Sequence, residues 1–174
     1  MPKRVAANTG ILSREELCKL PGCPSGDRLK KGPACVIECA EEIPCNPCGS
    51  ACPQGAIYIG ENILGLPALD EDICTGCGEC IPSCPGLAIF IVDLTFSDKE
   101  ALVKLPYEFL PIPKINEMVI CRNREGEIIC QGRTVEVLYN ETYDKTIVVA
   151  VAVPKEYGQE VRAITVERSE ASSF

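Results

Sequence analysis

Four cysteines lie close together in the stretch CTGCGECIPSCP, residues 74–85. They are separated by two, two and three residues, and a proline follows the fourth. A similar stretch, CNPCGSACP at residues 45–53, precedes them in the chain. Such tight clustering fits poorly with a closed disulfide framework, and so does an odd total of 13 cysteines. The two runs are therefore read as ligands for an inorganic group.

The two runs belong to an internal repeat with a period of 32 residues. Cys45, Cys48 and Cys52 correspond to Cys77, Cys80 and Cys84, and PQGAIYI corresponds to PGLAIFI. Ala56 and Ala88 each lie four residues after the last cysteine of their run, so the alignment needs no gap. A half of this size cannot bury a core alone. We therefore expect two half-modules related by a pseudo-two-fold axis.

The spacing in the second run favours an iron–sulfur cluster over zinc. A tetrahedral zinc ion usually receives its ligands as two pairs from separated segments. Here three cysteines in one tight loop can reach three corners of a cube, whereas Cys84, followed by Pro85, is turned toward a different cluster. Gly76 and Gly78 allow backbone N–H groups to approach the cluster sulfides. The chain has no histidine, which excludes His-ligated zinc and Rieske-type ligation.

Over residues 35–93 the chain resembles the two-[4Fe–4S] ferredoxins of the bacterial type. This resemblance implies two [4Fe–4S] clusters that exchange their fourth ligands between the two runs. One cluster would be bound by Cys74, Cys77, Cys80 and Cys52. The other would be bound by Cys45, Cys48, Cys84 and a further cysteine in the first position.

The first-position ligand departs from the family pattern. Three residues before Cys45 the chain has Glu42 rather than cysteine. Cys39 lies six residues before Cys45, ahead of a loop lengthened by AEEIP, and is our candidate. Cys35 is the alternative.

Five cysteines fall outside the two ligand sets: Cys18, Cys23, Cys35, Cys121 and Cys130. The first three could hold a further metal, but buried inert thiols are the commoner situation. If Glu125-Gly126 forms a two-residue hairpin turn, paired residues have numbers that sum to 251, so Cys121 would face Cys130. A disulfide or redox switch is one reading of this pair, and we favour two packed thiols.

The remaining elements are predicted from local signals. Residues 13–20 are expected to form a helix, with Ser13 and Glu16 in a capping box, followed by the connector SGDRLKKGPA. Residues 97–105 are expected to form a second helix, with Ser97 and Glu100 in the same relation. Prolines in PYEFLPIPK exclude both helix and central strand, so residues 106–114 read as a connector. The strands are expected within residues 117–166, in MVICRN, EIICQ, TVEVLYN, TIVVAVAVP and VRAITVE.

The expected fold class is α+β, with a ferredoxin-like two-cluster module and a separate small antiparallel β-sheet or barrel. The predicted domains are an N-terminal helix and connector (1–34), the cluster module (35–96), a helix and Pro-rich linker (97–116), a β domain (117–168) and a tail (169–174).

Composition narrows the functional classes. The formal charge of −8 argues against binding to nucleic acid or to an anionic membrane surface. No apolar run is long enough to span a bilayer, and the first ten residues lack a secretory h-region, so we expect a reducing cytoplasm. Without histidine, a Gly-rich phosphate loop or a nucleophile elbow, no catalytic site is predicted in this chain. Fully thiolate-ligated clusters in a net-negative protein are expected to have low reduction potentials.

The wider chain is similar to the small iron–sulfur subunit of FAD-dependent dehydrogenases of the amino-acid, amine or glycerol-3-phosphate type. RLKKGPACVIECAEEIPCNPC, CPGLAIF, LPYEFLPIP and VAVPKEYGQEVRAI carry this resemblance. It implies a hetero-oligomer in which the chain relays single electrons between a flavin on a larger subunit and another flavin or acceptor. The alternatives are a free-standing ferredoxin-like carrier and an interaction protein with a structural metal.

Overall fold

The computed structural model describes residues 10–143 and 146–167. The expectations for residues 1–9 and for the tail fall outside this range. The helical elements are α1 (Arg14–Leu17), α2 (Gly26–Leu29), α3 (Pro47–Ala51), η1 (Glu141–Tyr143) and η2 (Lys155–Tyr157). The strands are β1 (Ala34–Ile37), β2 (Ile57–Tyr58), β3 (Ala68–Leu69), β4 (Ile89–Asp93), β5 (Glu100–Tyr107), β6 (Met118–Arg122), β7 (Ile128–Leu138), β8 (Ile147–Pro154) and β9 (Ala163–Thr165).

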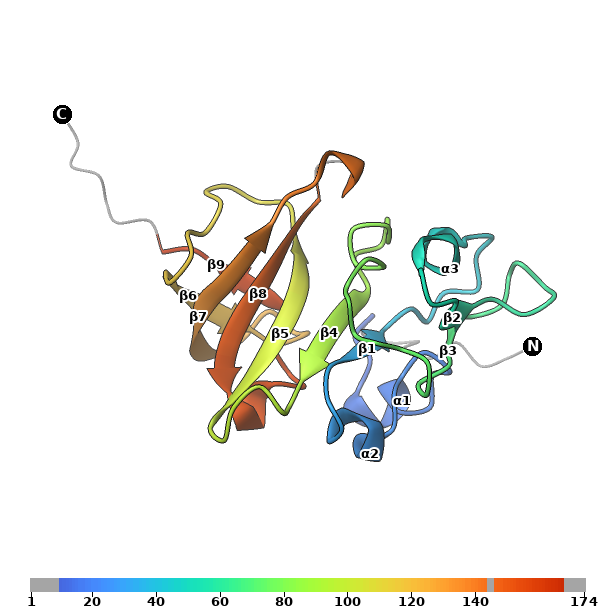
Figure 1. The fold of residues 1–174 in the computed structure, drawn as a ribbon, viewed down its shortest axis with the longest axis horizontal. Helices are drawn as coiled ribbons and strands as arrows, with labels where there is room; N and C mark the ends of the chain where they lie inside the picture. Colours follow the sequence, from blue (N-terminus) through green and yellow to red (C-terminus); the bar gives the residue numbers. More distant parts are fainter. Residues whose placement is uncertain (1–9, 144–145, 168–174) are drawn as a thin grey trace.

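One antiparallel sheet connects the cysteine-rich region to the C-terminal strands. Its order is β1-β4-β5-β8-β7-β6-β9, so β1 and β4 from the cysteine-rich region share a sheet with strands that were expected to stand apart (Figure 1). The α-helices have only four or five residues each, so the described chain is mostly strand. The α+β expectation gave too much weight to helix. The predicted residue limits of the domains stay a prediction.

Strand β8 connects the two apolar cores of the molecule. Its sequence IVVAVAV is buried along its length because β5 and β7 pair with it on both sides. Val149, Val151 and Val153 alternate toward the core of the C-terminal strands. Val148 faces the second core, which contains cysteines from both runs. Burial of β8 therefore fixes the cysteine-rich region against the sheet.

Residues 97–105 do not form the expected helix, and this prediction was wrong. The hydroxyl of Ser97 does accept a hydrogen bond from the Glu100 backbone N–H at 2.9 Å, but that bond closes a local turn ahead of β5. Along β5, residues 101, 103, 105 and 107 are buried and the residues between them are half-exposed. This period of two favours a strand, and pairing with the Val-rich β8 outweighs the capping signal.

Pro106 lies inside β5, although we expected prolines to exclude this segment from a central strand. Pro106 is opposite Val148 on β8, whereas the pairing of β5 with β4 ends at Lys104. Beyond Lys104 one side of β5 is therefore an edge, where the missing N–H of proline leaves no ladder bond unmade.

Strand β7 is one continuous strand, where two shorter ones were expected. Gly132 lies near the middle of β7. A larger residue would not fit there, because a Cβ would meet Val151 and lie 2.8 Å from the Cys121 Sγ. Cys121 pairs with Cys130, which confirms the predicted register. The turn itself differs, since the Asn123 N–H bonds the Glu127 carbonyl and encloses three residues rather than two. A bulge next to Cys121 compensates for the extra residue.

The N-terminal segment contains a confirmed helix and one that was missed. Ser13 and Glu16 form the expected capping box of α1, which ends three residues earlier than predicted. Helix α2 lies in the expected connector, and the Ser25 hydroxyl accepts a hydrogen bond from the Arg28 N–H at its start. Of the helices that the structure describes, none is long and apolar enough to cross a membrane.

The strand pairing repeats with the 32-residue period of the sequence. In the β1–β4 pair, Val36 lies opposite Phe90, and in the β2–β3 pair, Ala68 lies opposite Tyr58. Adding 32 to 36 gives 68, and subtracting 32 from 90 gives 58, so each pair maps onto the other. This is the exchange expected of two halves related by a pseudo-two-fold axis.

Candidate iron–sulfur site

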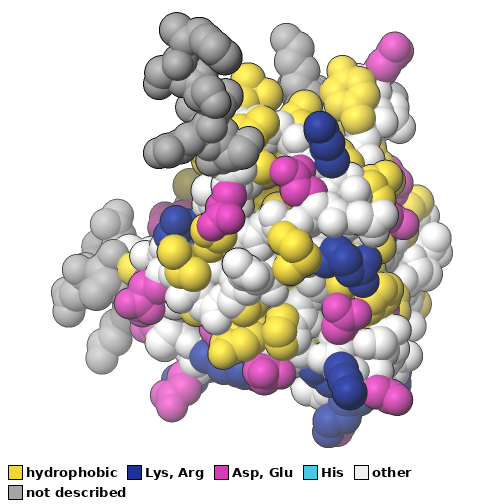
Figure 2. Space-filling view, turned by 90° about the vertical axis from the view of Figure 1, so that its left-hand side faces the viewer, with side chains coloured by type: hydrophobic (Ala, Val, Ile, Leu, Met, Phe, Trp, Pro, Cys, Tyr) yellow, Lys and Arg dark blue, Asp and Glu magenta, His cyan; other side chains and the backbone are white. Residues whose placement is uncertain are grey.

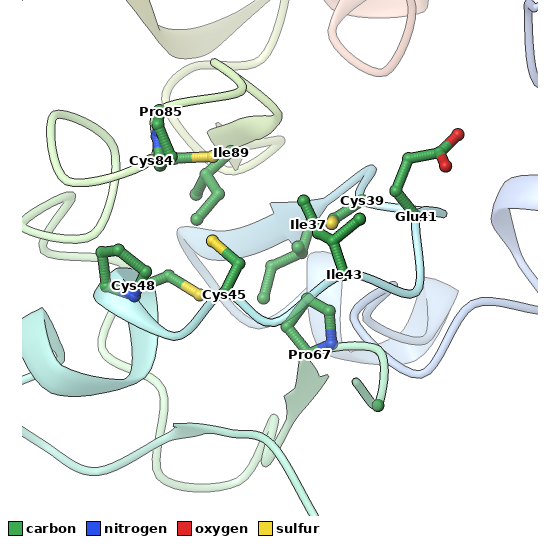
Figure 3. A pocket seen from close by; sticks show the side chains of 12 residues that line it. Ile37, Cys39, Glu41, Ile43, Cys45, Cys48, Pro67, Cys84, Pro85 and Ile89 are labelled. Atoms are coloured by element: carbon green, nitrogen blue, oxygen red, sulfur yellow. The ribbon is translucent and has the colours of Figure 1, made fainter. Parts of the chain in front are cut away.

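The first pocket contains four cysteines from separate parts of the cysteine-rich region. It is lined by Cys39, Cys45, Cys48 and Cys84, with apolar neighbours that include Ile37, Ile43, Pro67 and Ile89. Figure 3 shows Cys45, Cys48 and Cys84 on one side of this pocket and Cys39 with Glu41 on the other. Cys84 comes from the second run, so this pocket brings together cysteines from both runs.

The second pocket contains the complementary set. It is lined by Cys52, Cys74, Cys77, Cys80 and Cys35, with Ile57 and Ile91 among its apolar neighbours. Cys52 comes from the first run. Cys77 is exposed and Cys80 is buried, so this pocket reaches from the surface into the core.

Strands β1 and β4 separate the two candidates for the first-position cysteine. Ile37 pairs with Ile89, and both line the first pocket. Cys35 pairs with Ile91, and both line the second pocket. This pair lies two residues, or about 7 Å, along the strands from the pair of Ile37 and Ile89. Cys35 is therefore held away from Cys45 and Cys48, whereas Cys39, just beyond β1, lines the same pocket as they do.

The last cysteine of each run makes the same backbone contacts in both halves. The Ala56 N–H donates to the Cys52 Sγ at 3.3 Å, and the Ala88 N–H donates to the Cys84 Sγ at 3.4 Å. Hydrogen bonds of this kind to a ligand sulfur stabilise a negative cluster.

These contacts need a left-handed residue just before each alanine. Gly55 has φ of +66° and Leu87 has φ of +52°, and both N–H groups bond the preceding cysteine carbonyl at 3.1 Å. Leucine rarely adopts this conformation, so the turn after Cys84 is held by its surroundings.

Cys35 and Cys80 interact directly, with 3.7 Å between their sulfurs. The hydrogen bond to Cys80, together with burial, raises the pKa of Cys35. The same bond lowers the pKa of Cys80. Burial also raises the pKa of Cys39, and it raises the pKa of Cys48 to about 11.

The other cysteines are free and lie outside both pockets. Cys18 and Cys23 lie near α1, apart from Cys35, and the pKa of Cys23 is raised to about 11, mainly by burial. Burial likewise raises the pKa of Cys121 and Cys130. They are not joined by a disulfide in the structure, and their redox state stays a prediction.

Sequence patterns did not reveal the polar residues that hold the ligand loops. The Arg28 guanidinium donates to the Cys74 carbonyl at 2.7 Å. Glu38, the residue before Cys39, accepts hydrogen bonds from Arg124 and Arg162 at 2.6 Å each. The partners are separated by 46, 86 and 124 residues, so local signals could not have shown them.

The donor sets fit iron–sulfur cubes. Each pocket holds at least four thiols and no histidine, which is the ligand chemistry of a [4Fe–4S] cluster. Within the described ranges, no three Cys, Asp or Glu side chains converge closely enough for one shared ion. A cube needs wider spacing than a single ion, because each of its thiolates binds a different iron.

The second run matches a known family. Residues 67–90 match the 4Fe-4S binding domain family, so the chain carries a 4Fe-4S binding domain. The chain is 42% identical over 57 residues to one subunit of the Na⁺-translocating ferredoxin:NAD⁺ oxidoreductase complex of Acetobacterium woodii, covering 33% of this chain and 16% of that protein. It is 34% identical over 83 residues to an uncharacterized ferredoxin of Methanocaldococcus jannaschii, covering 44% and 48%.

A third relative is one of the subunits of tetrathionate reductase from Archaeoglobus fulgidus, 51% identical over 41 residues, or 23% of this chain and 19% of that protein. The chain thus spans less than half the length of each of these relatives. No solved structure matches the chain.

Proposed function

We propose that the chain is an electron-transfer subunit that holds two [4Fe–4S] clusters. Cys39, Cys45, Cys48 and Cys84 would bind one, and Cys52, Cys74, Cys77 and Cys80 would bind the other. The observation that supports this proposal is that Cys84 of the second run lines the pocket of Cys45 and Cys48, whereas Cys52 of the first run lines the pocket of Cys74, Cys77 and Cys80.

When bound, such clusters accept and release single electrons without forming or breaking substrate bonds. The chain contributes the path between them. On β4, Ile89 lines the first pocket and Ile91 lines the second, and both side chains are buried. Buried apolar side chains between the pockets limit solvent access and help to set the reduction potentials of the clusters. Cys77 is exposed, so an external partner could approach the second cluster closely.

The segment from Glu108 to Glu117, here called the strap, supports a subunit rather than a mobile carrier. It connects β5 to β6 and exposes Phe109, Leu110, Ile112 and Ile115, with 78% of Leu110 accessible. The strap is anchored where the Tyr107 hydroxyl donates to the Pro111 carbonyl at 2.8 Å. The face on the side of β6, β7 and β9 shows several hydrophobic side chains among charged ones (Figure 2). Exposed apolar groups on a fixed segment favour a protein partner.

The partner in this proposal is a larger, FAD-containing dehydrogenase subunit in the cytoplasm. Hydride oxidation delivers two electrons to a flavin, and two one-electron clusters let them leave singly toward another flavin or acceptor. The resemblance of the strap and of the segments beside the cysteines to such small subunits supports this choice. Tightly clustered cysteines in an odd total of 13 suit a reducing compartment better than a disulfide framework.

A free-standing ferredoxin-like carrier is the second candidate. The relative from Methanocaldococcus jannaschii, of which 48% is covered, is named as a ferredoxin. In that case the C-terminal strands would only stabilise the cluster module.

Affinity purification of the chain at native abundance, under anaerobic conditions, separates the two candidates. We expect a flavoprotein in fixed ratio with the chain and a flavin spectrum in the complex. Recovery of the chain alone, with two reducible clusters and no flavoprotein, would favour the carrier.

A further inference from the structure

Arg28 connects helix α2 to the loop that leads into the second run. Its guanidinium donates to four backbone carbonyls, those of Glu71 (2.8 Å), Gly32 (3.2 Å), Pro33 (2.9 Å) and Cys74 (2.7 Å). Glu71 in turn accepts hydrogen bonds from the backbone and hydroxyl of Ser25, just before α2. The backbone position of Cys74 is therefore fixed by a side chain from outside the repeat.

The loop packs tightly at this point. Gly76 has φ of +66°, and a Cβ there would lie 2.6 Å from the Pro33 carbonyl oxygen. Arg28 binds that same oxygen, so one guanidinium holds together the start of β1 and the loop of residues 74–76. The five fixed donors of arginine suit such a multiple contact, whereas lysine cannot reproduce it.

The lengthened loop of the first run has a different anchor at Glu38. Arg124, at the tip of the β6–β7 hairpin, donates two hydrogen bonds to the Glu38 carboxylate, at 2.6 and 3.0 Å. Arg162, just before β9, donates to the same carboxylate at 2.6 Å. The exposed fraction of the side chain is 14% for Arg124, 7% for Arg162 and 11% for Glu38. Solvent therefore screens these contacts only weakly.

The anchor extends into the C-terminal region. Arg124 also pairs with Glu160 at 2.9 Å and donates to the Gln159 carbonyl at 3.0 Å. The Arg162 guanidinium lies 4.7 Å from the centre of the Phe90 ring on β4. Glu38, the residue before Cys39, is thus held by Arg124 from the hairpin tip and by Arg162 from the segment before β9. Arg162 in turn packs on Phe90 of β4.

We propose that these arginines are positioning residues, each set serving one cluster. Arg28 holds the first-position ligand Cys74 of one cluster. Arg124 and Arg162, acting through Glu38, hold the first-position ligand Cys39 of the other, whose loop lacks the short family spacing. The segments on either side of the repeat thereby control the two clusters separately. This inference rests on the proposed function, because it assumes the two clusters.

The proposal predicts cluster-selective effects, which a general loss of stability would not produce. The test uses the full chain, reconstituted anaerobically, with iron counting, EPR of the reduced protein and potentiometric titration.

Cys39→Ser and Cys74→Ser first assign each EPR signal and each redox couple to its pocket. Arg28→Lys and Arg124→Lys then keep the charge and remove the guanidinium, and Arg28→Gln and Arg124→Gln remove both. Lys30→Gln and Arg133→Lys are matched controls, because Lys30 pairs with Asp27 at the surface and Arg133 pairs with Glu100 on the sheet.

We expect the Arg28 variants to alter only the signal assigned through Cys74, and the Arg124 variants only the signal assigned through Cys39. The Gln variants should lower the affected midpoint potential further than the Lys variants, since a nearby cation favours the added electron. Loss of the affected cluster alone, with iron falling from about eight to about four per chain, gives the same support.

Equal changes in both signals, or no change in either, would overturn the positioning role. Wild-type protein that binds zinc or fewer than two clusters would instead overturn the proposed function, so the two failures can be distinguished. Controls that alter a signal as strongly as the Arg28 or Arg124 variants would also overturn the proposal.

Discussion

At the scale of single residues, the two candidate first-position cysteines differ in what they contact. Cys39 lines the first pocket together with Cys45 and Cys48, whereas Cys35 is fixed by β1 beside Cys80. We expect Cys39→Ser to weaken or remove one cluster and Cys35→Ser to leave about eight irons per chain. Iron analysis with EPR checks both. An intact pair of clusters in Cys39→Ser, with a loss in Cys35→Ser, would reverse the assignment.

Two buried threonines offer a matched test of hydrogen bonding. The Thr134 hydroxyl is fully buried and has no partner among the described residues, whereas the Thr146 hydroxyl donates to Glu108 at 2.7 Å. Thr134→Val should therefore raise the free energy of unfolding by about 1 kcal/mol, because an unsatisfied polar group leaves the core. Thr146→Val should lower it by a similar amount. Chemical denaturation measures both, and a loss of stability in Thr134→Val would contradict the first expectation.

Residue types and spacing predicted the cysteines of the candidate site, since neighbours in a tight loop need no tertiary information. They did not decide between Cys39 and Cys35, because that choice depends on the register of β1 against β4. The anchors at Arg28 and Glu38 could not be predicted for a related reason. Their contacts join residues far apart in the sequence, and an isolated arginine carries no sign of its partner.

At the scale of elements, the strands in the C-terminal half were mostly predicted, and the largest error was the helix expected at residues 97–105. Ser97 and Glu100 form a local turn that also begins many helices, so the capping pattern alone pointed to the wrong element. The alternation of Ala101, Val103 and Leu105 was the better signal, and it became decisive once β8 was available as a partner. Tertiary pairing overrode a local preference.

Gly132 provides a test of packing between elements. An added methyl group would press into Val151 and the Cys121 sulfur across the core face of β7. We expect Gly132→Ala to lower the free energy of unfolding by about 1–3 kcal/mol. Gly26→Ala is the control, because nothing lies within 4 Å of a Cβ there and its φ is not left-handed. Thermal or chemical unfolding of both variants measures the difference, and equal stabilities would contradict this account of the close approach.

At the scale of the whole molecule, the continuous sheet explains what the additions to the cysteine repeat do. Strands β1 and β4 form the wall of both pockets and also belong to the sheet that ends in β9. The C-terminal strands are thus tied to the candidate electron path, and the strap projects from the same sheet. The first pocket depends on these strands most directly, since Arg124 and Arg162 both bind Glu38.

The strap is the proposed contact with the larger subunit. Leu110→Glu places a charge on its most exposed apolar side chain, which should weaken association with the partner by at least about tenfold, or ~1.4 kcal/mol. Iron content and both EPR signals should stay unchanged, because the strap lies outside the two pockets. Ile63→Glu, at an exposed position between β2 and β3 and away from the strap, serves as the control. Quantitative co-purification or calorimetry measures the effect, and unchanged affinity would argue against docking through the strap.

The most direct test of the central claim is iron and acid-labile sulfide analysis of the anaerobically purified chain, combined with EPR of the reduced form. We predict about eight irons and eight sulfides per chain and two reducible clusters at low potential. Zinc in place of iron, or a single cluster with about four irons, would contradict it.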